Sequence, residues 1–252
     1  MSGGRFLYLK DGEYMRLTDI HCHLLPKVDD GAKNEEEALK LLEMEYAQGV
    51  RRIIVTPHYR IEMFETDQER IEQQYRWLKA AAEQLYDDLE IYLGCEYHAN
   101  SGILEDLKTH RREALAGSRY VLVEFSGMDS FAKQRKQIRE LTGAGYIPVI
   151  AHAERYECLR NDIKNIEELI FFGAKIQVNA DSVLGEEGRK TKAFCKKLMK
   201  QDLVDFIASD AHCMKGRAPN LGRCAEYVEK KMGHEYAQRI FVENPSEIFN
   251  RE

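Results

Sequence analysis

The chain has 252 residues, a length that suits one barrel-like α/β domain better than two full domains. Its 44% hydrophobic content is enough for a sizeable core, and its net charge of −6 without any long basic run argues against a nucleic-acid-binding surface. No signal peptide or apolar run of about 18 residues is present, so we expect no membrane insertion and a cytoplasmic location. None of the six cysteines is spaced as C-x-x-C, which favours free thiols over a zinc ribbon.

Seven short apolar runs rich in β-branched residues recur along the chain. About 27 to 38 residues separate them, the spacing of strand–loop–helix units. We expect residues 15–252 to form one domain and the polar residues 1–14 to be a non-functional extension. The runs are Leu17–His21, Arg52–Thr56, Glu90–Cys95, Tyr120–Phe125, Ile147–His152, Ala174–Asn179 and Asp205–Ser209.

The segments between these runs carry helix signals. Asn34 precedes three glutamates and is a good N-cap, while Thr66 with Glu69 forms a capping-box pattern. Apolar residues then recur at helical spacing and predict a buried stripe; they are Ile71, Tyr75, Leu78, Ala82 and Leu85. Alternation of strands and helices predicts a parallel sheet, and seven units indicate a closed or nearly closed barrel.

Ligand-type side chains gather at the carboxyl ends of six of these seven runs. In a parallel barrel those ends open onto one face, so residues distant in the sequence can converge. One polar residue at a strand end is usually a cap or a loop hydrogen-bonder, but six such ends together favour a metal site. The candidates are His21, His23, Asp29 or Asp30, His58, Glu96, Glu124, His152, Asp210 and His212.

The chemistry of these candidates indicates the kind of metal and substrate. Imidazole and carboxylate ligands suit Mn²⁺, Fe²⁺ or Zn²⁺ and argue against a thiolate site. Nine ligands are enough for three ions, and three divalent cations with four carboxylates leave a surplus of about two positive charges, which suits a phosphate monoester. Arg155 and Arg217 follow ligand residues closely and could bind phosphate oxygens through two parallel hydrogen bonds.

Other catalytic motifs are absent from the sequence. No cysteine is followed six positions later by arginine, which excludes the C-x5-R loop of thiolate phosphatases, and neither G-x-x-x-x-G-K-[ST] nor G-x-G-x-x-G occurs. Amidohydrolase barrels also begin with H-x-H but usually bridge their metals with a lysine on the fourth strand, where this chain has Glu124. Tyr59, Met63 and Phe64 could line a groove for an aromatic substrate or pack as a lid.

Several segments resemble the polymerase and histidinol phosphatase (PHP) superfamily, from Thr18 to about Pro245. Within it the chain is most similar to the bacterial tyrosine-protein phosphatases of capsule and exopolysaccharide operons, the CpsB/YwqE-like group. M-F-E-T and A-H-x-E-R-Y are the specific signatures, because neither is general in the superfamily. The matching segments are D-I-H-C-H, V-D-D-G-A-K, G-V-R-R-I-I-V-T-P-H, M-F-E-T, G-C-E-Y, V-E-F-S, P-V-I-A-H-A-E-R-Y and I-A-S-D-A-H.

This resemblance implies a distorted seven-stranded (β/α)7 TIM-like barrel with a trinuclear centre. It selects Asp30 over Asp29, and it implies three divalent cations, with Mn²⁺ expected and Fe, Zn or Mg as alternatives. It also assigns phosphate contacts to Arg155 and Arg217. The implied ligands are His21, His23, Asp30, His58, Glu96, Glu124, His152, Asp210 and His212.

The mechanism that follows is direct hydrolysis of phosphotyrosine by a metal-activated hydroxide. His58 or His212 would give the proton to the leaving phenolate, and the sequence does not choose between them. By resemblance the substrate is the tyrosine-rich tail of a bacterial tyrosine kinase of polysaccharide export, and a homo-oligomer is left open. The alternatives are hydrolysis of histidinol phosphate or another small phosphomonoester, and a non-catalytic metal-holding regulatory module.

Overall fold

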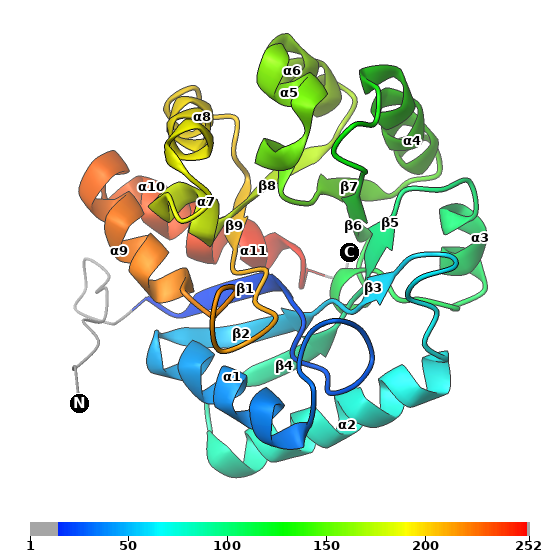
Figure 1. Cartoon of the computed structure of the whole chain (residues 1–252), viewed down its shortest axis with the longest axis vertical. Coiled ribbons are helices and arrows are strands. Elements are labelled where there is room, and N and C mark those ends of the chain that lie inside the picture. Colours follow the sequence, from blue (N-terminus) through cyan, green and yellow to red (C-terminus); the bar gives the residue numbers. More distant parts are fainter. Residues whose placement is uncertain (1–14, 251–252) are drawn as a thin grey trace.

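The computed structural model describes residues 15–250, so the predicted extension at 1–14 lies outside the described residues. Strand segments and helices alternate along the chain, and the helices surround the strands (Figure 1). The strand segments are β1 (Leu17–Cys22), β2 (Val50–Val55), β3 (His58–Tyr59), β4 (Glu90–Leu93), β5 (Glu96–His98), β6 (Tyr120–Glu124), β7 (Ile147–Ile150), β8 (Lys175–Asn179) and β9 (Phe206–Ala208).

Every pair of neighbouring strands is parallel, which confirms the predicted α/β class. One sheet has the order β1-β2-β4 and the other β3-β5-β6-β7-β8-β9. The second predicted run is continued by β3 after a break at residues 56–57, and the third by β5 after a break at 94–95. Cys22 also forms a parallel bridge to Ala211 just after β9, so the last strand returns to the first.

The helices lie outside the strands. The longest helices are α1, α2, α4, α8 and α9, and several of the loops contain short helices. Their bounds are α1 (Glu35–Ala47), α2 (Gln68–Leu85), α3 (Ile103–Lys108), η1 (Leu115–Gly117), α4 (Phe131–Gly143), η2 (Ala153–Arg155), α5 (Glu157–Asn161), α6 (Lys164–Phe171), α7 (Ala180–Leu184), α8 (Arg189–Lys200), α9 (Leu221–Met232), α10 (His234–Gln238), η3 (Arg239–Glu243) and α11 (Asn244–Glu247).

Local signals were right at α1 and partly wrong at α2. The Asn34 side chain accepts a hydrogen bond from the Glu37 N–H, as an N-cap should. The capping box is wrong, because α2 begins at Gln68 and the Thr66 hydroxyl instead donates to the Val28 carbonyl. The stripe on α2 also ends early, since Leu85 is 56% exposed.

Two apolar clusters hold the strands in place. The larger one packs the helices against the outside of the strands, and the smaller one includes Ile20, Ile54, Leu122, Val149 and Phe206 from different strands. Burial of these side chains supplies the main stabilisation of the fold. In the described part of the chain, no helix has the length and apolar character needed to span a membrane.

Candidate metal centre

Glu96 lies at the middle of a cluster of histidines at the carboxyl ends of the strands. Its Oε2 atom is 2.8 Å from Nδ1 of His58 and 3.2 Å from Nε2 of His21. Its Oε1 atom is 2.9 Å from Nε2 of His152. The Glu96 side chain is fully buried. Residues from β1, β3, β5 and the loop after β7 therefore meet around one carboxylate.

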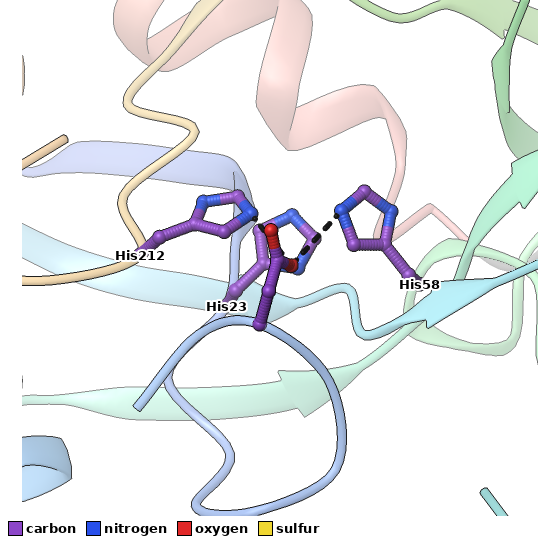
Figure 2. Close-up of side chains that lie close together, drawn as sticks. His23, His58 and His212 are labelled. Atoms are coloured by element: carbon purple, nitrogen blue, oxygen red, sulfur yellow. Dashed lines mark ion pairs between the residues drawn. The ribbon is translucent and has the colours of Figure 1, made fainter. Parts of the chain in front are cut away.

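Asp30 joins two further histidines on the more open side of this cluster. Its Oδ1 atom is 3.3 Å from Nε2 of His58 and 3.3 Å from Nε2 of His212. Figure 2 shows the rings of His23, His58 and His212 gathered around one point, and the His23 and His212 ring centroids are 3.8 Å apart. The first βα loop thus brings Asp30 to residues from β3 and from the segment after β9.

Asp210 connects the cluster to both predicted phosphate-binding arginines. Its Oδ1 atom is 3.4 Å from Nε2 of His21. Arg155 donates to Asp210 Oδ2 at 3.1 Å, and Arg217 donates to Oδ1 at 2.9 Å. Glu124 lies at the edge, with Oε1 3.9 Å from Nε2 of His152. The structure therefore brings all nine predicted ligands and both arginines into one cluster.

The backbone is strained at two of these positions. His152 has a φ of 33° and Asp210 a φ of 52°, both in the left-handed region that non-glycine residues rarely adopt. Each such residue costs on the order of 1–3 kcal/mol and persists where the surrounding structure requires it. Both lie just beyond a strand end, where the change in chain direction turns the side chain toward the cluster.

In several of the histidines, one ring nitrogen forms a hydrogen-bonding contact with a group behind the cluster. Nδ1 of His23 is 2.7 Å from Oδ2 of Asp29, and Nδ1 of His212 is 2.9 Å from the Asp210 carbonyl. Tyr156 donates to the Ala151 carbonyl, so its oxygen can accept from Nδ1 of His152 at 3.2 Å. Each contact places a proton on Nδ1 and leaves the Nε2 lone pair facing the cluster.

Asp29 has a different position from Asp30. It accepts hydrogen bonds from the Gly31 and His58 N–H groups as well as contacting His23, and its side chain is buried. These partners occupy its carboxylate, whereas the half-exposed Asp30 carboxylate faces two histidines. This geometry supports the choice of Asp30 as a ligand and gives Asp29 the role of orienting His23.

The cluster fits a divalent cation. Glu96 Oε2 and His212 Nε2 are buried, and their contacts with other members of the cluster do not have the geometry of hydrogen bonds. Such atoms need a cation or a proton, because buried polar atoms are normally satisfied. Oxygen and imidazole nitrogen suit Mn²⁺, Fe²⁺ or Zn²⁺. Potential ligand atoms form three overlapping groups within 4.8 Å, which are His23–Asp30–His58–His212, His21–His23–Glu96 and His58–Glu96–Glu124.

Protons replace cations in the metal-free centre. Burial opposes protonation of His21, but the charges of Glu96 and Asp210 raise its pKa to about 9. Burial also opposes protonation of His58, where the charge of Glu96 and the hydrogen bond that His58 donates to Asp30 raise the pKa to about 11. Both imidazoles are therefore protonated at neutral pH when no metal is bound.

We expect metal binding to release protons for this reason. A cation must displace one proton from His21 and one from His58, so apparent affinity should rise with pH up to about 9 for the first proton and on toward 11 for the second. Calorimetric titration of metal-free protein with Mn²⁺ in buffers of different ionisation enthalpy measures the release directly. Binding at pH 7 without net proton release would contradict this expectation.

The sequence reasoning missed the residues that orient the ligands. Gln177 and Asn179 lie on β8, where no ligand was predicted, and both are buried against the cluster. Their alternation with the apolar Ile176 and Val178 is the signal that could have identified them. Tyr156 is the last residue of the A-H-A-E-R-Y segment and lies against His152.

The sequence model of a family described as "Capsular polysaccharide synthesis, CpsB/CapC" matches residues 17–250. The chain belongs to the CpsB/CapC family. Tyrosine-protein phosphatase CpsB of Streptococcus pneumoniae is 37% identical over 237 residues, covering 92% of this chain and 98% of the relative. Tyrosine-protein phosphatase YwqE of Bacillus subtilis is 31% identical over 227 residues, covering 87% of this chain and 86% of YwqE.

Solved structures agree with this assignment to the CpsB/CapC family. A structure from a study of B. subtilis YwqE and S. pneumoniae CpsB, described as unique metal-dependent tyrosine phosphatases, superposes with a TM-score of 0.87 at 28% identity, covering 94% of this chain and 96% of the other. Histidinol phosphate phosphatase of Lactococcus lactis shares the fold with a TM-score of 0.54 at 17% identity, covering 86% of this chain and 94% of that chain.

Proposed function

We propose that this protein is a metal-dependent protein-tyrosine phosphatase. The observation that carries the proposal is the buried nitrogen-and-oxygen cluster with two arginines at its edge. The names of the CpsB and YwqE relatives describe the same activity for those proteins. A centre of cations flanked by guanidinium groups suits a phosphate monoester, whose charge is near −2 at neutral pH.

We further propose a trinuclear centre with Mn²⁺ as the resident metal. The three overlapping groups share His23, His58 and Glu96 and together contain seven of the nine predicted ligands, which supports three neighbouring cations. The other two, His152 and Asp210, contact Glu96 and His21. When bound, divalent cations supply Lewis-acid charge and lower the pKa of water from about 15.7 toward about 7. Counting β2 with β3 and β4 with β5 as single bent strands gives the distorted seven-stranded barrel that the sequence predicts.

Arg155 and Arg217 would bind the phosphate oxygens. Their side chains are 32% and 35% exposed, and both approach the centre through Asp210. A guanidinium presents two parallel donors to a tetrahedral anion, so the pair can hold the phosphate from one side. Arg155 also donates to Glu187 Oε1 at 3.3 Å.

The contacts favour His58 over His212 as the proton donor to the leaving group. The Asp210 carbonyl holds Nδ1 of His212, and the side chain of this histidine is only 2% exposed. His58 is 12% exposed and has carboxylates opposite both ring nitrogens, with no backbone carbonyl holding either. If one His58 nitrogen binds a cation, the other keeps its N–H, and we propose that this N–H faces the leaving oxygen.

Phe64 provides an apolar surface beside the proton donor. Its ring stacks on His58 with centroids 5.0 Å apart and an interplanar angle of 15°. Paired hydrogen bonds between Arg60 and Phe64 close the turn that carries the ring. We propose that the phosphotyrosine ring lies along Phe64. Tyr59 does not line this surface, because it is 3% exposed and packs under Arg112.

The proposed partner is the tyrosine-rich tail of a bacterial tyrosine kinase of capsule or exopolysaccharide synthesis. The family description, capsular polysaccharide synthesis, supports this context. We propose that the protein meets this tail in the cytoplasm. No role in nucleic-acid binding is proposed, since the net charge is −6.

Comparison of substrates tests the proposed function. We expect Mn²⁺-loaded protein to hydrolyse a phosphotyrosine peptide with kcat/KM at least about 100-fold above that for histidinol phosphate, since the phenolate is the better leaving group and its ring can contact Phe64. A phosphoserine peptide of the same sequence is the control. Faster turnover of histidinol phosphate would favour the small-substrate alternative, and no turnover of any aryl phosphate would favour a metal-holding regulatory module.

A further inference from the structure

Two side-chain amides on β8 form a chain of hydrogen bonds behind the metal centre. Gln177 Oε1 accepts from the His152 N–H at 2.9 Å and lies 3.1 Å from Nδ1 of His21. Gln177 Nε2 donates to Asn179 Oδ1 at 2.8 Å, and Asn179 Nδ2 donates to Asp210 Oδ2 at 2.7 Å. Gln177 and Asn179 are respectively 0% and 1% exposed, so water does not compete for these contacts.

One backbone N–H determines the direction of every hydrogen bond in this series. The His152 N–H can only donate, so the Gln177 atom beside it must be the oxygen. The Gln177 nitrogen then has to point at the Asn179 oxygen, which turns the Asn179 nitrogen toward Asp210. No other assignment of the two amides satisfies all the buried groups.

This direction fixes a proton on His21. The Gln177 oxygen is an acceptor only, so Nδ1 of His21 must carry the hydrogen. Nε2 of the neutral ring then presents its lone pair, 3.2 Å from Glu96 Oε2 and 3.4 Å from Asp210 Oδ1. At the other end, the Asn179 amide holds Oδ2 of Asp210 and leaves Oδ1 toward the histidines.

We infer that Gln177 and Asn179 are positioning residues of the metal centre, which set the tautomer of His21 and the orientation of the Asp210 carboxylate. The strand that supplies no predicted ligand thus aligns ligands carried by β1 and by the segment after β9. The inference rests on the metal centre of the proposed function and not on its substrate. Its test therefore measures metal binding, which stays informative if the protein hydrolyses something other than phosphotyrosine.

The substitution Gln177→Met tests this role at nearly constant volume. Removing the acceptor allows the His21 proton to move to Nε2, so we expect affinity for Mn²⁺ to fall about 10- to 100-fold, as measured by competition with a chelator. Val178→Ala is the matched control, because Val178 lies on the same strand but is buried in the larger apolar cluster. This control should lower the unfolding temperature of metal-free protein while leaving Mn²⁺ affinity within about twofold.

A conservative variant separates positioning from packing. Gln177→Glu keeps an oxygen that accepts from both His21 and the His152 N–H and loses only the donor to Asn179. Its Mn²⁺ affinity should therefore lie below wild type but at least about fivefold above that of Gln177→Met. If Gln177→Met does not fold, Gln177→Asn replaces it in the test, because the shorter side chain moves the acceptor oxygen away from His21 by one methylene. Wild-type affinity in the Met or Asn variant, or equal weakening by Glu, would overturn the inference.

Discussion

Replacing Glu96 by glutamine is expected to remove most bound metal and to lower kcat/KM by at least about 10³-fold. The Glu96 carboxylate lies within 3.2 Å of nitrogens of His21, His58 and His152, so both of its oxygens face the centre. Glutamine has the same shape but presents one amide N–H₂ toward imidazoles that should bind a cation. Elemental analysis of purified protein and turnover of an aryl phosphate measure the two losses.

Cys22→Ser is the matched control for this experiment. Cys22 lies between His21 and His23 in the sequence, yet its buried sulfur points toward the Ile54 carbonyl and away from the centre. A serine hydroxyl can donate to the same carbonyl, so metal content and activity should stay within about twofold of wild type. Retention of metal and activity by Glu96→Gln would contradict a metal mechanism centred on this carboxylate.

Alanine at either Arg155 or Arg217 is expected to lower kcat/KM by about 10²- to 10³-fold without removing metal. Removing one aligned cationic donor typically costs this much when charge develops on the bound group. Each variant leaves the other arginine on Asp210, so that carboxylate keeps a partner. Steady-state kinetics with a phosphotyrosine peptide, paired with elemental analysis, gives both quantities.

Lysine and a distant arginine serve as controls for these variants. Arg155→Lys keeps the charge but loses the two parallel donors, so its kcat/KM should lie between those of wild type and Arg155→Ala. Arg160→Ala removes the same charge from an exposed position on α5 and should leave kcat/KM within about twofold. Loss of metal in the alanine variants would show that the arginines hold the centre together rather than the phosphate.

Much of the strand framework could be predicted from the sequence because its signals are local. Runs of β-branched residues, such as Tyr120–Phe125, form strands whose side chains meet in the two apolar clusters. The glycines at 145, 173 and 233 follow α4, α6 and α9 with positive φ angles, and glycine after a helical stretch is a local signal for its end. The capping box at Thr66 was wrong because its hydroxyl found a distant carbonyl, a contact that local spacing cannot reveal.

The convergence of the candidate ligands was also predictable, since parallel strands bring their carboxyl ends to one face. The sequence by itself therefore determined which types of side chain meet at this centre and where along the chain they come from. Only the tertiary structure decided which atoms face each other. In the structure, Asp29 contacts His23 and two N–H groups, whereas Asp30 faces two histidines. Both arginines donate to Asp210.

The amides of β8 show the same limit most clearly. Gln177 and Asn179 could be recognised as polar residues in an apolar strand, but their partners come from β1, from the loop after β7 and from the segment after β9. Hydrogen-bond direction depends on distances between these segments, which the packing of the whole barrel sets. Residue types are local information, whereas the protonated nitrogen of a buried histidine is a property of the assembled fold.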